Sequence, residues 1–186
     1  TANKALIAKH SEEVFNAAYQ SPGSLGYEAS VGGGIPIIRS VKEGFSGDII
    51  EGFSGIINGT ANFILSSMTN DKQDFSTALK IAQENGYAEA DPTFDVEGLD
   101  SAQKLSIIAS LAFNANINQD ILTWGITKIS KNDIDYAKEM GYTIKLLAIA
   151  KIINNEIELR VHPTMIHADH VLAGVRYENN ADFIER

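Results

Sequence analysis

A long β-hairpin near the carboxyl end is the feature that most restricts the fold of this chain. Residues 142–153 and 156–162 are rich in β-branched and other apolar side chains, and Asn154 and Asn155 separate them. Asparagine tolerates the left-handed backbone conformation that tight hairpin turns require. The sequence therefore predicts two antiparallel strands in this region.

Helical patterns occupy much of the chain before the hairpin. They cover about residues 11–20, 36–45, 61–68, 75–85, 100–113 and 130–141. Their start signals are polar capping residues, namely Ser11, Thr60, Asp74 and the pair Ser130 and Asp133, which resembles a capping box. Residues 25–31 and 48–58 favour strands. Strict βαβ alternation is missing, so we expect an α+β fold with a mixed or antiparallel sheet and helices packed on one face.

Composition narrows the classes of function. The 186 residues are 44% hydrophobic and 21% charged, which is typical of one main globular domain. The net charge is −9 and the basic residues are scattered, which argues against nucleic-acid binding. Lys145 and Lys151 interrupt the apolar run at 144–153, so we expect no membrane span. Cysteine is absent, which excludes disulfides and thioester chemistry and is compatible with a reducing cytoplasm.

The most informative segment for chemistry is acid-rich and reads AEADPTFDVEGLDSAQK. Asp100 and Lys104 are four residues apart, which places their Cβ atoms about 5–6 Å apart on one helix face, and Glu89 can fold over them from the loop. A lysine held between carboxylates can bind a substrate oxygen while the acids bind a substrate ammonium. Neighbouring carboxylates favour the protonated lysine, so a proton-donor role is easier to accept than a base. The same spacing also fits an ordinary surface ion pair, or a capping box of Asp100 and Gln103.

A run of three glycines at 32–34 is the second candidate site, because it lies just before Pro36. Glycines let the backbone approach a ligand closely or direct carbonyl groups at a cation, although a tight turn into a helix explains them equally well. His167 and His170 lack a third metal ligand nearby, so we assign no site to them.

Five blocks, in order along the chain, resemble the homoserine dehydrogenase family. They are TANKALIA, EASVGGGIPIIRS, GIINGTANFIL, AQENGYAEADPTFDVEGLDSAQKL and GYTIKLLAIA, and they span nearly the whole chain. The resemblance implies the catalytic-domain fold of that family over residues 25–186, with substrate-binding and dimerisation functions, and a remnant of a Rossmann nucleotide-binding domain over residues 1–24. It also implies NAD(P)-dependent interconversion of L-homoserine and L-aspartate 4-semialdehyde by a cytoplasmic homodimer, in the pathway to threonine, methionine and isoleucine.

The resemblance also implies roles for individual residues. Lys104 corresponds to the proton donor or acceptor, and Lys4 is the second catalytic candidate. The implied cofactor contacts come from Thr1 and Lys4. The implied substrate-binding residues are Gly86, Glu89, Asp100 and Thr60. A monovalent cation, sodium, would be held by Glu28, Val31, Gly33 and Ile35, three of which can offer only backbone carbonyl oxygens.

Two glycine-rich segments that contact the cofactor in the family have no counterpart in these 186 residues. We therefore expect the chain to fold without binding a dinucleotide tightly or turning over by itself, as a non-catalytic substrate-binding or dimerisation module. A rival chemistry is a Schiff base on Lys104, as in a class I aldolase.

Overall fold

A five-stranded mixed sheet forms the base of the fold. The computed structural model describes residues 1–117 and 120–186. The strands are β1 (Gly52–Ile56), β2 (Leu122–Thr123), β3 (Tyr142–Ile153), β4 (Glu156–His167) and β5 (Ala181–Glu185), in the spatial order β2-β4-β3-β1-β5. Among the described strands, β2 and β4 pair in parallel and the other three pairs are antiparallel. The predicted α+β class with a mixed sheet is confirmed.

The hairpin of β3 and β4 is the longest strand pair. Its register runs without interruption from Tyr142 opposite His167 to Ile153 opposite Glu156. Asn154 and Asn155 have φ values of 52° and 64°, so both adopt the left-handed conformation of a type I′ turn. The predicted hairpin is confirmed, and β4 is longer than the sequence indicated.

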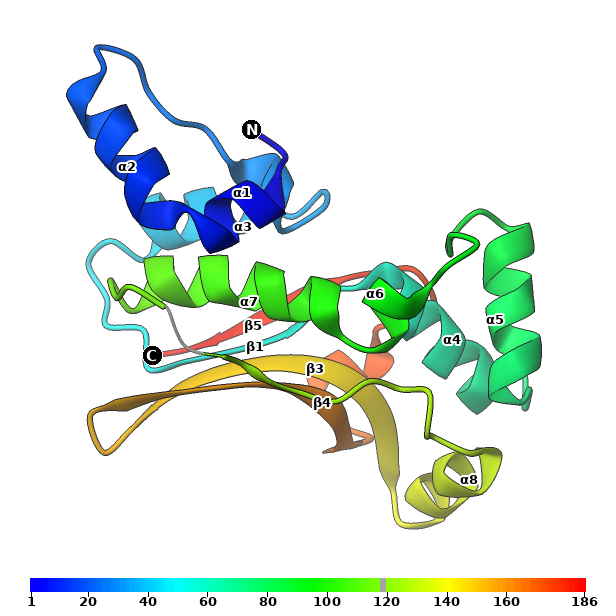
Figure 1. Cartoon of the computed structure of the whole chain (residues 1–186). Coiled ribbons are helices and arrows are strands. Elements are labelled where there is room, and N and C mark those ends of the chain that lie inside the picture. Colours follow the sequence, from blue (N-terminus) through cyan, green and yellow to red (C-terminus); the bar gives the residue numbers. More distant parts are fainter. Residues whose placement is uncertain (118–119) are drawn as a thin grey trace.

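Helices cover one face of the sheet in two layers. The α-helices are α1 (Lys4–Lys9), α2 (Ser11–Gln20), α3 (Ile37–Arg39), α4 (Gly59–Asn70), α5 (Phe75–Glu84), α6 (Thr93–Val96), α7 (Leu99–Ala112) and α8 (Lys131–Glu139). Short 3-10 helices cover Glu28–Ser30 (η1) and Val171–Gly174 (η3), and a π-helix, η2, covers Ser40–Gly44. Figure 1 shows α7 lying along the sheet, with α1, α2 and α3 on the far side of α7 from the strands.

The main core lies between the sheet and α7. Alternate residues of β3, among them Ile144 and Ala148, enter this core beside Leu105 and Ile108 of α7. All four are at most 6% exposed, and removing such apolar area from water is the main source of stability. The alternate β3 side chains point to the opposite face of the sheet, where Leu147 and Ile149 form a smaller cluster with Leu172 of η3. The core therefore holds α7 rigidly over the sheet.

Most helix predictions are confirmed, but the caps predicted at Ser11 and Thr60 are wrong, and the alternative of a capping box at Asp100 is not observed. His10 occupies the N-cap position of α2 and makes no side-chain cap. Asn58 caps α4 in place of Thr60, because its side-chain oxygen accepts the Ala61 N–H. Gly98, with φ of 80°, precedes α7, so Asp100 lies inside the first turn and is not its cap. The caps predicted for α5 and α8 are confirmed.

The strand predicted at 25–31 is also wrong, since this segment contains η1 and coil. Tyr27 and Val31 are buried as a strand reading requires, but they pack into the main core without joining the sheet. The Glu28 carboxylate accepts the backbone N–H groups of Ile38 and Arg39, at 2.8 and 2.9 Å, and so joins this segment to α3.

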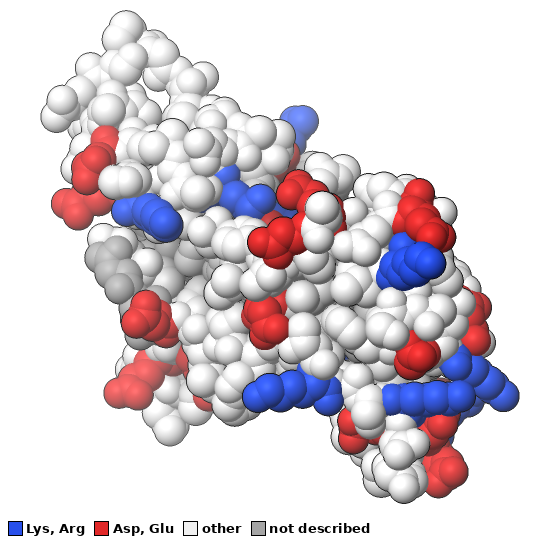
Figure 2. All heavy atoms as spheres, turned by 45° about the vertical axis from the view of Figure 1, so that its right-hand side comes forward, with Lys and Arg blue, Asp and Glu red and all other residues white. Residues whose placement is uncertain are grey.

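The surface carries both signs of charge. On the face drawn in Figure 2, Lys and Arg side chains are interspersed with Asp and Glu side chains and do not form one continuous stripe. No helix within the described ranges is long and apolar enough to span a bilayer.

Candidate active site

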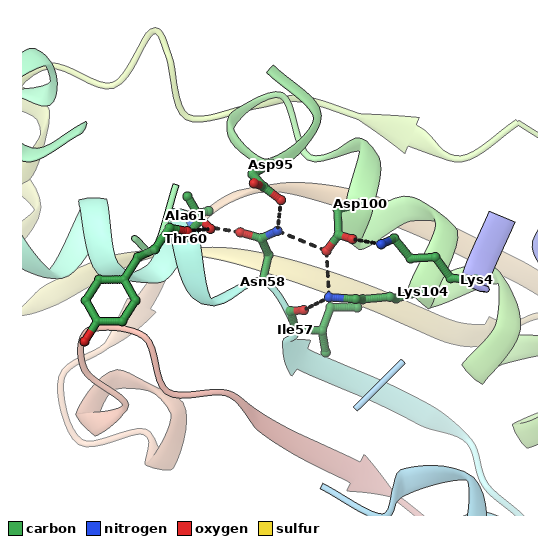
Figure 3. A network of polar contacts seen from close by, with 9 residues as sticks. Lys4, Ile57, Asn58, Thr60, Ala61, Asp95, Asp100 and Lys104 are labelled. Atoms are coloured by element: carbon green, nitrogen blue, oxygen red, sulfur yellow. Dashed lines mark hydrogen bonds and ion pairs between the residues drawn. The ribbon is translucent and has the colours of Figure 1, made fainter. Parts of the chain in front are cut away.

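Asp100 lies between two lysines at the start of α7. Lys104 Nζ is 2.7 Å from Asp100 Oδ2, and Lys4 Nζ is 3.0 Å from Asp100 Oδ1. Lys4 comes from α1, while the other two residues lie one helical turn apart on α7 (Figure 3). One carboxylate, 4% exposed, therefore joins two ammonium groups from separate parts of the chain.

Lys104 has a second partner at the end of β1. Its Nζ donates to the carbonyl oxygen of Ile57 at 2.9 Å. An ammonium has three donors, and within residues 1–117 and 120–186 two of them are engaged, by Asp100 and Ile57. The third remains free for a ligand, and 17% of the Lys104 side chain is exposed to receive one.

Asn58 connects this cluster to the acid-rich loop. Its Nδ2 group donates to Asp95 Oδ1 at 2.8 Å and to Asp100 Oδ2 at 3.0 Å. Its Oδ1 atom accepts the Ala61 N–H at 2.8 Å, which caps α4. These three hydrogen bonds of a single side chain connect the end of β1 with α4, α6 and α7. Figure 3 shows Asn58 pointing at both carboxylates.

The charge state of Asp100 follows from these contacts. Burial raises the pKa of this carboxyl, but Lys104, Asn58 and Lys4 outweigh burial and hold the pKa below its usual value. Asp100 is therefore a carboxylate at neutral pH. A carboxylate at 2.7 Å stabilises the ammonium form of Lys104, so the arrangement suits proton donation.

The other predicted substrate residues lie around the acid-rich loop. Thr60 Oγ1 donates to the carbonyl oxygen of Tyr87, which fixes the loop against the start of α4. Gly86 ends α5 with φ of 77°, a conformation that favours glycine. Glu89 is exposed, and its carboxylate forms no hydrogen bond or ion pair with a described residue, although its backbone carbonyl accepts from Gln83 at 3.1 Å. The structure does not bring the Glu89 side chain onto the two lysines.

The residues predicted to hold a cation form a separate turn. Gly33 has φ of 60°, and a Cβ on Gly32 would lie 2.2 Å from the Ile35 carbonyl oxygen, so the turn depends on glycine. The Ile35 carbonyl accepts the Ile37 N–H at 2.9 Å, and Glu28 uses both carboxylate oxygens on α3. No group of three His, Cys, Asp or Glu side chains in the described part of the chain could hold a metal ion.

Sequence reasoning missed Asn58, Asp95 and the Ile57 carbonyl. Asn58 had a detectable signal, because asparagine just before a helical pattern is a favoured N-cap. Asp95 belongs to the acid-rich segment, but its distance in sequence from Asn58 gave no reason to pair them. Thr1 contacts none of the cluster residues: its Oγ1 accepts the Asn3 N–H at 3.1 Å, and its amino group donates to the Gly26 carbonyl oxygen.

Comparisons with known proteins agree on one family. A family model described as homoserine dehydrogenase matches residues 36–186. A homoserine dehydrogenase of Pseudomonas aeruginosa is 49% identical over 182 residues, which cover 97% of this chain and 42% of that protein. The crystal structure of a homoserine dehydrogenase from Thiobacillus denitrificans has a TM-score of 0.96 and 48% identity, over 100% of this chain and 43% of that one.

A hyperthermophilic archaeal homoserine dehydrogenase, solved in complex with NADPH, shares the fold with a TM-score of 0.82. It is 24% identical and is covered over 53% of its length by 99% of this chain. The chain spans less than half the length of the bacterial relatives that it matches.

Proposed function

Because the chain belongs to the homoserine dehydrogenase family, we propose that it is the substrate-binding part of an NAD(P)-dependent oxidoreductase acting on L-homoserine and L-aspartate 4-semialdehyde. One observation carries the proposal. Lys104 Nζ contacts a buried carboxylate, donates to the Ile57 carbonyl oxygen, and keeps one donor free at a partly exposed position. That arrangement suits the transfer of a proton to an oxygen at which negative charge develops.

In the reducing direction, Lys104 Nζ donates a hydrogen bond to the aldehyde oxygen of the substrate. The nicotinamide group of the cofactor supplies the hydride when it is bound. As the new C–H bond forms at the aldehyde carbon, the carbonyl π electrons move to oxygen, and Lys104 transfers a proton to it to give the alcohol. Asp100 and Ile57 keep the amine in place afterwards until solvent returns the proton.

Lys4 and Thr1 are proposed to face the cofactor. Lys4 uses one donor on Asp100, and 33% of its side chain is exposed, which suits an additional contact with a negatively charged group. Lys4 also holds Asp100 from the side opposite Lys104, so its removal is expected to disturb the geometry of the pair.

The amino-acid end of the substrate is assigned to the acid-rich loop. Glu89 has an exposed carboxylate without an ion-pair partner among the described side chains, and it can receive the substrate ammonium. Gly86 and Thr60 set the path of the loop that carries it. Asp100 is already engaged by two lysines, so its contribution is to position them.

The glycine turn is proposed to bind sodium through Glu28, Val31, Gly33 and Ile35. Backbone carbonyl oxygens are suitable donors for a hard cation, and each accepts more than one contact. The Ile35 carbonyl therefore keeps a lone pair after binding the Ile37 N–H. The Glu28 side chain is committed to α3, so Glu28 would contribute its carbonyl.

Association of two copies through the sheet is a further part of the proposal. Leu122, on β2, is 51% exposed, and Trp124, directly after β2, is 61% exposed. Light scattering after size exclusion tests this, because Trp124→Lys should lower the mass while Tyr19→Lys, on α2, should not.

The use of NAD(P), an intracellular cofactor, supports a cytoplasmic location.

The central test is turnover by the protein that contains this chain, followed by NADPH or NADH oxidation with L-aspartate 4-semialdehyde. Lys104→Met should lower kcat by about 10²–10⁴-fold, the usual contribution of a positioned proton donor, with a much smaller effect on KM. Lys80→Met is the matched control, since Lys80 is exposed and pairs with Glu84 within α5. Near-normal turnover of Lys104→Met would contradict the proposed role. Trapping of substrate on Lys104 by borohydride would favour the Schiff-base alternative.

A further inference from the structure

We propose that this chain binds a small oxyanion of phosphate size in a second cleft, lined by Lys138, Lys145 and Arg176. The cleft lies where the carboxyl ends of α4 and α8 meet the start of β3 and the segment after η3. Its volume of about 300 Å³ is at the lower end of the range for small-molecule sites. It shares no residue with the Lys104 cluster, so the proposal is independent of the function proposed above.

The three cations of the cleft have no carboxylate partners. Neither Lys138, Lys145 nor Arg176 forms an ion pair with any acid in the described ranges. No Asp or Glu among the described residues lines the cleft, and the acid that follows α4, Asp71, lies beside the Tyr177 hydroxyl at 3.5 Å. Three positive charges that face one cleft repel one another, so an anion between them is favourable.

The buried member of the set is Lys145, which is 2% exposed. Its Nζ donates to Asn62 Oδ1 at 2.9 Å and to the Val175 carbonyl, both of which are uncharged. An ammonium has three donors, so one remains for a ligand. A lysine buried on neutral oxygens alone is unfavourable without a compensating charge, and an oxyanion in the cleft that it lines would supply that charge.

The neutral groups of the cleft add donors. Ser66 Oγ accepts the Tyr177 N–H at 2.9 Å, which leaves its hydroxyl hydrogen to donate elsewhere. The Asn70 side chain has no hydrogen-bond partner among the described residues and offers an amide N–H₂ group. Thr69 is unsuitable, because its hydroxyl already donates to Leu65 at 2.7 Å. A site with many donors and three cations is complementary to an oxyanion.

Two helix ends also face the cleft, and their negative partial charge must be counted. Lys138 lies in the last turn of α8, and Ser66 and Asn70 belong to the last turns of α4. Each helix carboxyl end is equivalent to about half a negative charge. Two ends therefore offset about one of the three positive charges, and the cleft keeps an excess of about two.

The protonation state of Lys145 is compatible with the site. Burial, together with the nearby Arg176, lowers the pKa of Lys145 to about 8. Lys145 therefore remains mostly charged at neutral pH, and a bound anion would strengthen the charged form.

Titration of the ¹⁵N-labelled chain with inorganic phosphate at constant ionic strength tests the proposal. We expect saturable shifts of the Gly141, Thr143 and Gly174 amides, which line the cleft. Lys138→Gln and Arg176→Gln, both at exposed side chains, should each weaken binding about tenfold, the effect of losing one charge-assisted hydrogen bond. Lys131→Gln is the matched control, because Lys131 is an exposed lysine at the other end of α8.

Glycerol 3-phosphate provides a second arm that identifies the source of the oxyanion. Tighter binding of the ester than of phosphate would assign the cleft to a phosphate monoester, and equal binding would assign it to free phosphate. Shifts that do not saturate, that spread over other surface lysines, or that persist in both cleft variants would overturn the proposal. The two variants are surface changes, so unaltered spectra without phosphate verify that they fold.

Discussion

Two lysines, the partly exposed Lys104 and the buried Lys145, have opposite electrostatic environments. Lys104 donates to the Ile57 carbonyl at 2.9 Å and contacts the Asp100 carboxylate at 2.7 Å. Lys145 also donates to a backbone carbonyl, but its other partner is the neutral amide oxygen of Asn62. The charge of Lys104 is therefore compensated from within the chain, whereas that of Lys145 is not.

The difference suits the two lysine ammonium groups to different functions. A compensated lysine stays charged in the folded protein and can give its proton to a reacting oxygen while its carboxylate partner holds it in place. For a lysine without a compensating charge, the charged form is unfavourable, and the side chain attracts an external anion. Under the two proposals, the same residue type would serve proton transfer at Lys104 and anion binding at Lys145.

Removing the compensating charge of Lys104 should have the largest effect. Asp100→Ala leaves two ammonium groups near each other without a carboxylate, and we expect the free energy of unfolding to fall by about 3 kcal/mol at pH 7, the lower end for a broken buried pair because Lys4 is partly exposed. Urea denaturation measures the change. Glu43→Ala, which removes an exposed partner of Arg39, should change stability by less than about 0.5 kcal/mol.

The pH dependence of the Asp100 effect follows from its lowered pKa. The stabilisation is present above the pKa of the unfolded carboxyl and is lost as the pH falls through the lower pKa of the folded state. The difference between wild type and Asp100→Ala should therefore shrink in acid. An Asp100→Ala protein as stable as wild type at pH 7 would mean that Lys104 needs no compensation and that the comparison with Lys145 is unsound.

Asp182 is the reverse case of Lys145, because it is an acidic side chain that forms no ion pair with a described Lys, Arg or His. Both of its carboxylate oxygens are buried and lack a hydrogen-bond partner in the described part of the chain. Burial raises the pKa of Asp182 to about 6. The folded state therefore holds a proton that the unfolded state has released, and this group lowers stability as the pH rises from about 4 to above 6.

Replacing Asp182 by valine should therefore stabilise the protein. We expect the free energy of unfolding to rise by about 2 kcal/mol at pH 7, with little gain at pH 4, where the wild-type group is protonated in the folded state. Denaturation at both pH values measures this difference. Asp135→Val, at an exposed position of α8, is the control, and an equal effect of Asp182→Val at both pH values would mean that its carboxylate is not the destabilising group.

The fold could be predicted in large part because its signals are local. Two segments rich in β-branched and other apolar residues, separated by two asparagines, defined the β3–β4 hairpin, and Ser130 with Asp133 defined the start of α8. The strand predicted at 25–31 failed because burial of Tyr27 and Val31 by α-helices produces the same apolar pattern as burial in a sheet. A local sequence pattern indicates that a side chain is buried, but it does not indicate which element covers that side chain.

In the candidate site, too, local contacts could be predicted from the sequence and long-range contacts could not. The spacing of Asp100 and Lys104 along one helix was visible in the sequence, and the pair forms as expected. The contacts of Asn58 with Asp95 and Asp100 span 37 and 42 residues, and those of Lys145 with Asn62 span 83. Contacts at such separations depend on how α4, α7 and the sheet pack, which periodicity does not specify.

Asn58 donates to Asp100, the carboxylate partner of Lys104, and Asn62 accepts from Lys145. Loss of the Asn58 side chain should lower the free energy of unfolding more than loss of an ordinary helix cap. Asn58→Ala removes the N-cap of α4, which costs about 1 kcal/mol, and also two hydrogen bonds, one to the buried Asp100 and one to the partly buried Asp95. We expect a total loss of about 2 kcal/mol. Asp74→Ala removes the cap of α5 without touching either site and is the matched control. Equal losses in the two variants would limit Asn58 to a capping role.

The smallest effect should come from Lys145 itself, and its pH dependence distinguishes it from Lys104. Lys145→Met removes a desolvated charge but also the hydrogen bonds to Asn62 and Val175, and these opposing effects leave a change below about 1 kcal/mol at pH 7. The folded-state pKa of about 8 is lower than the ordinary 10.5, so the charged lysine destabilises the wild type fully below pH 8, and this penalty disappears as the pH rises toward 10.5. Between pH 7 and 9 the wild type should therefore gain about 1 kcal/mol relative to Lys145→Met. Other titrating groups are common to both proteins and cancel in this difference. A constant difference across that range would show that the Lys145 charge is compensated after all, as the charge of Lys104 is.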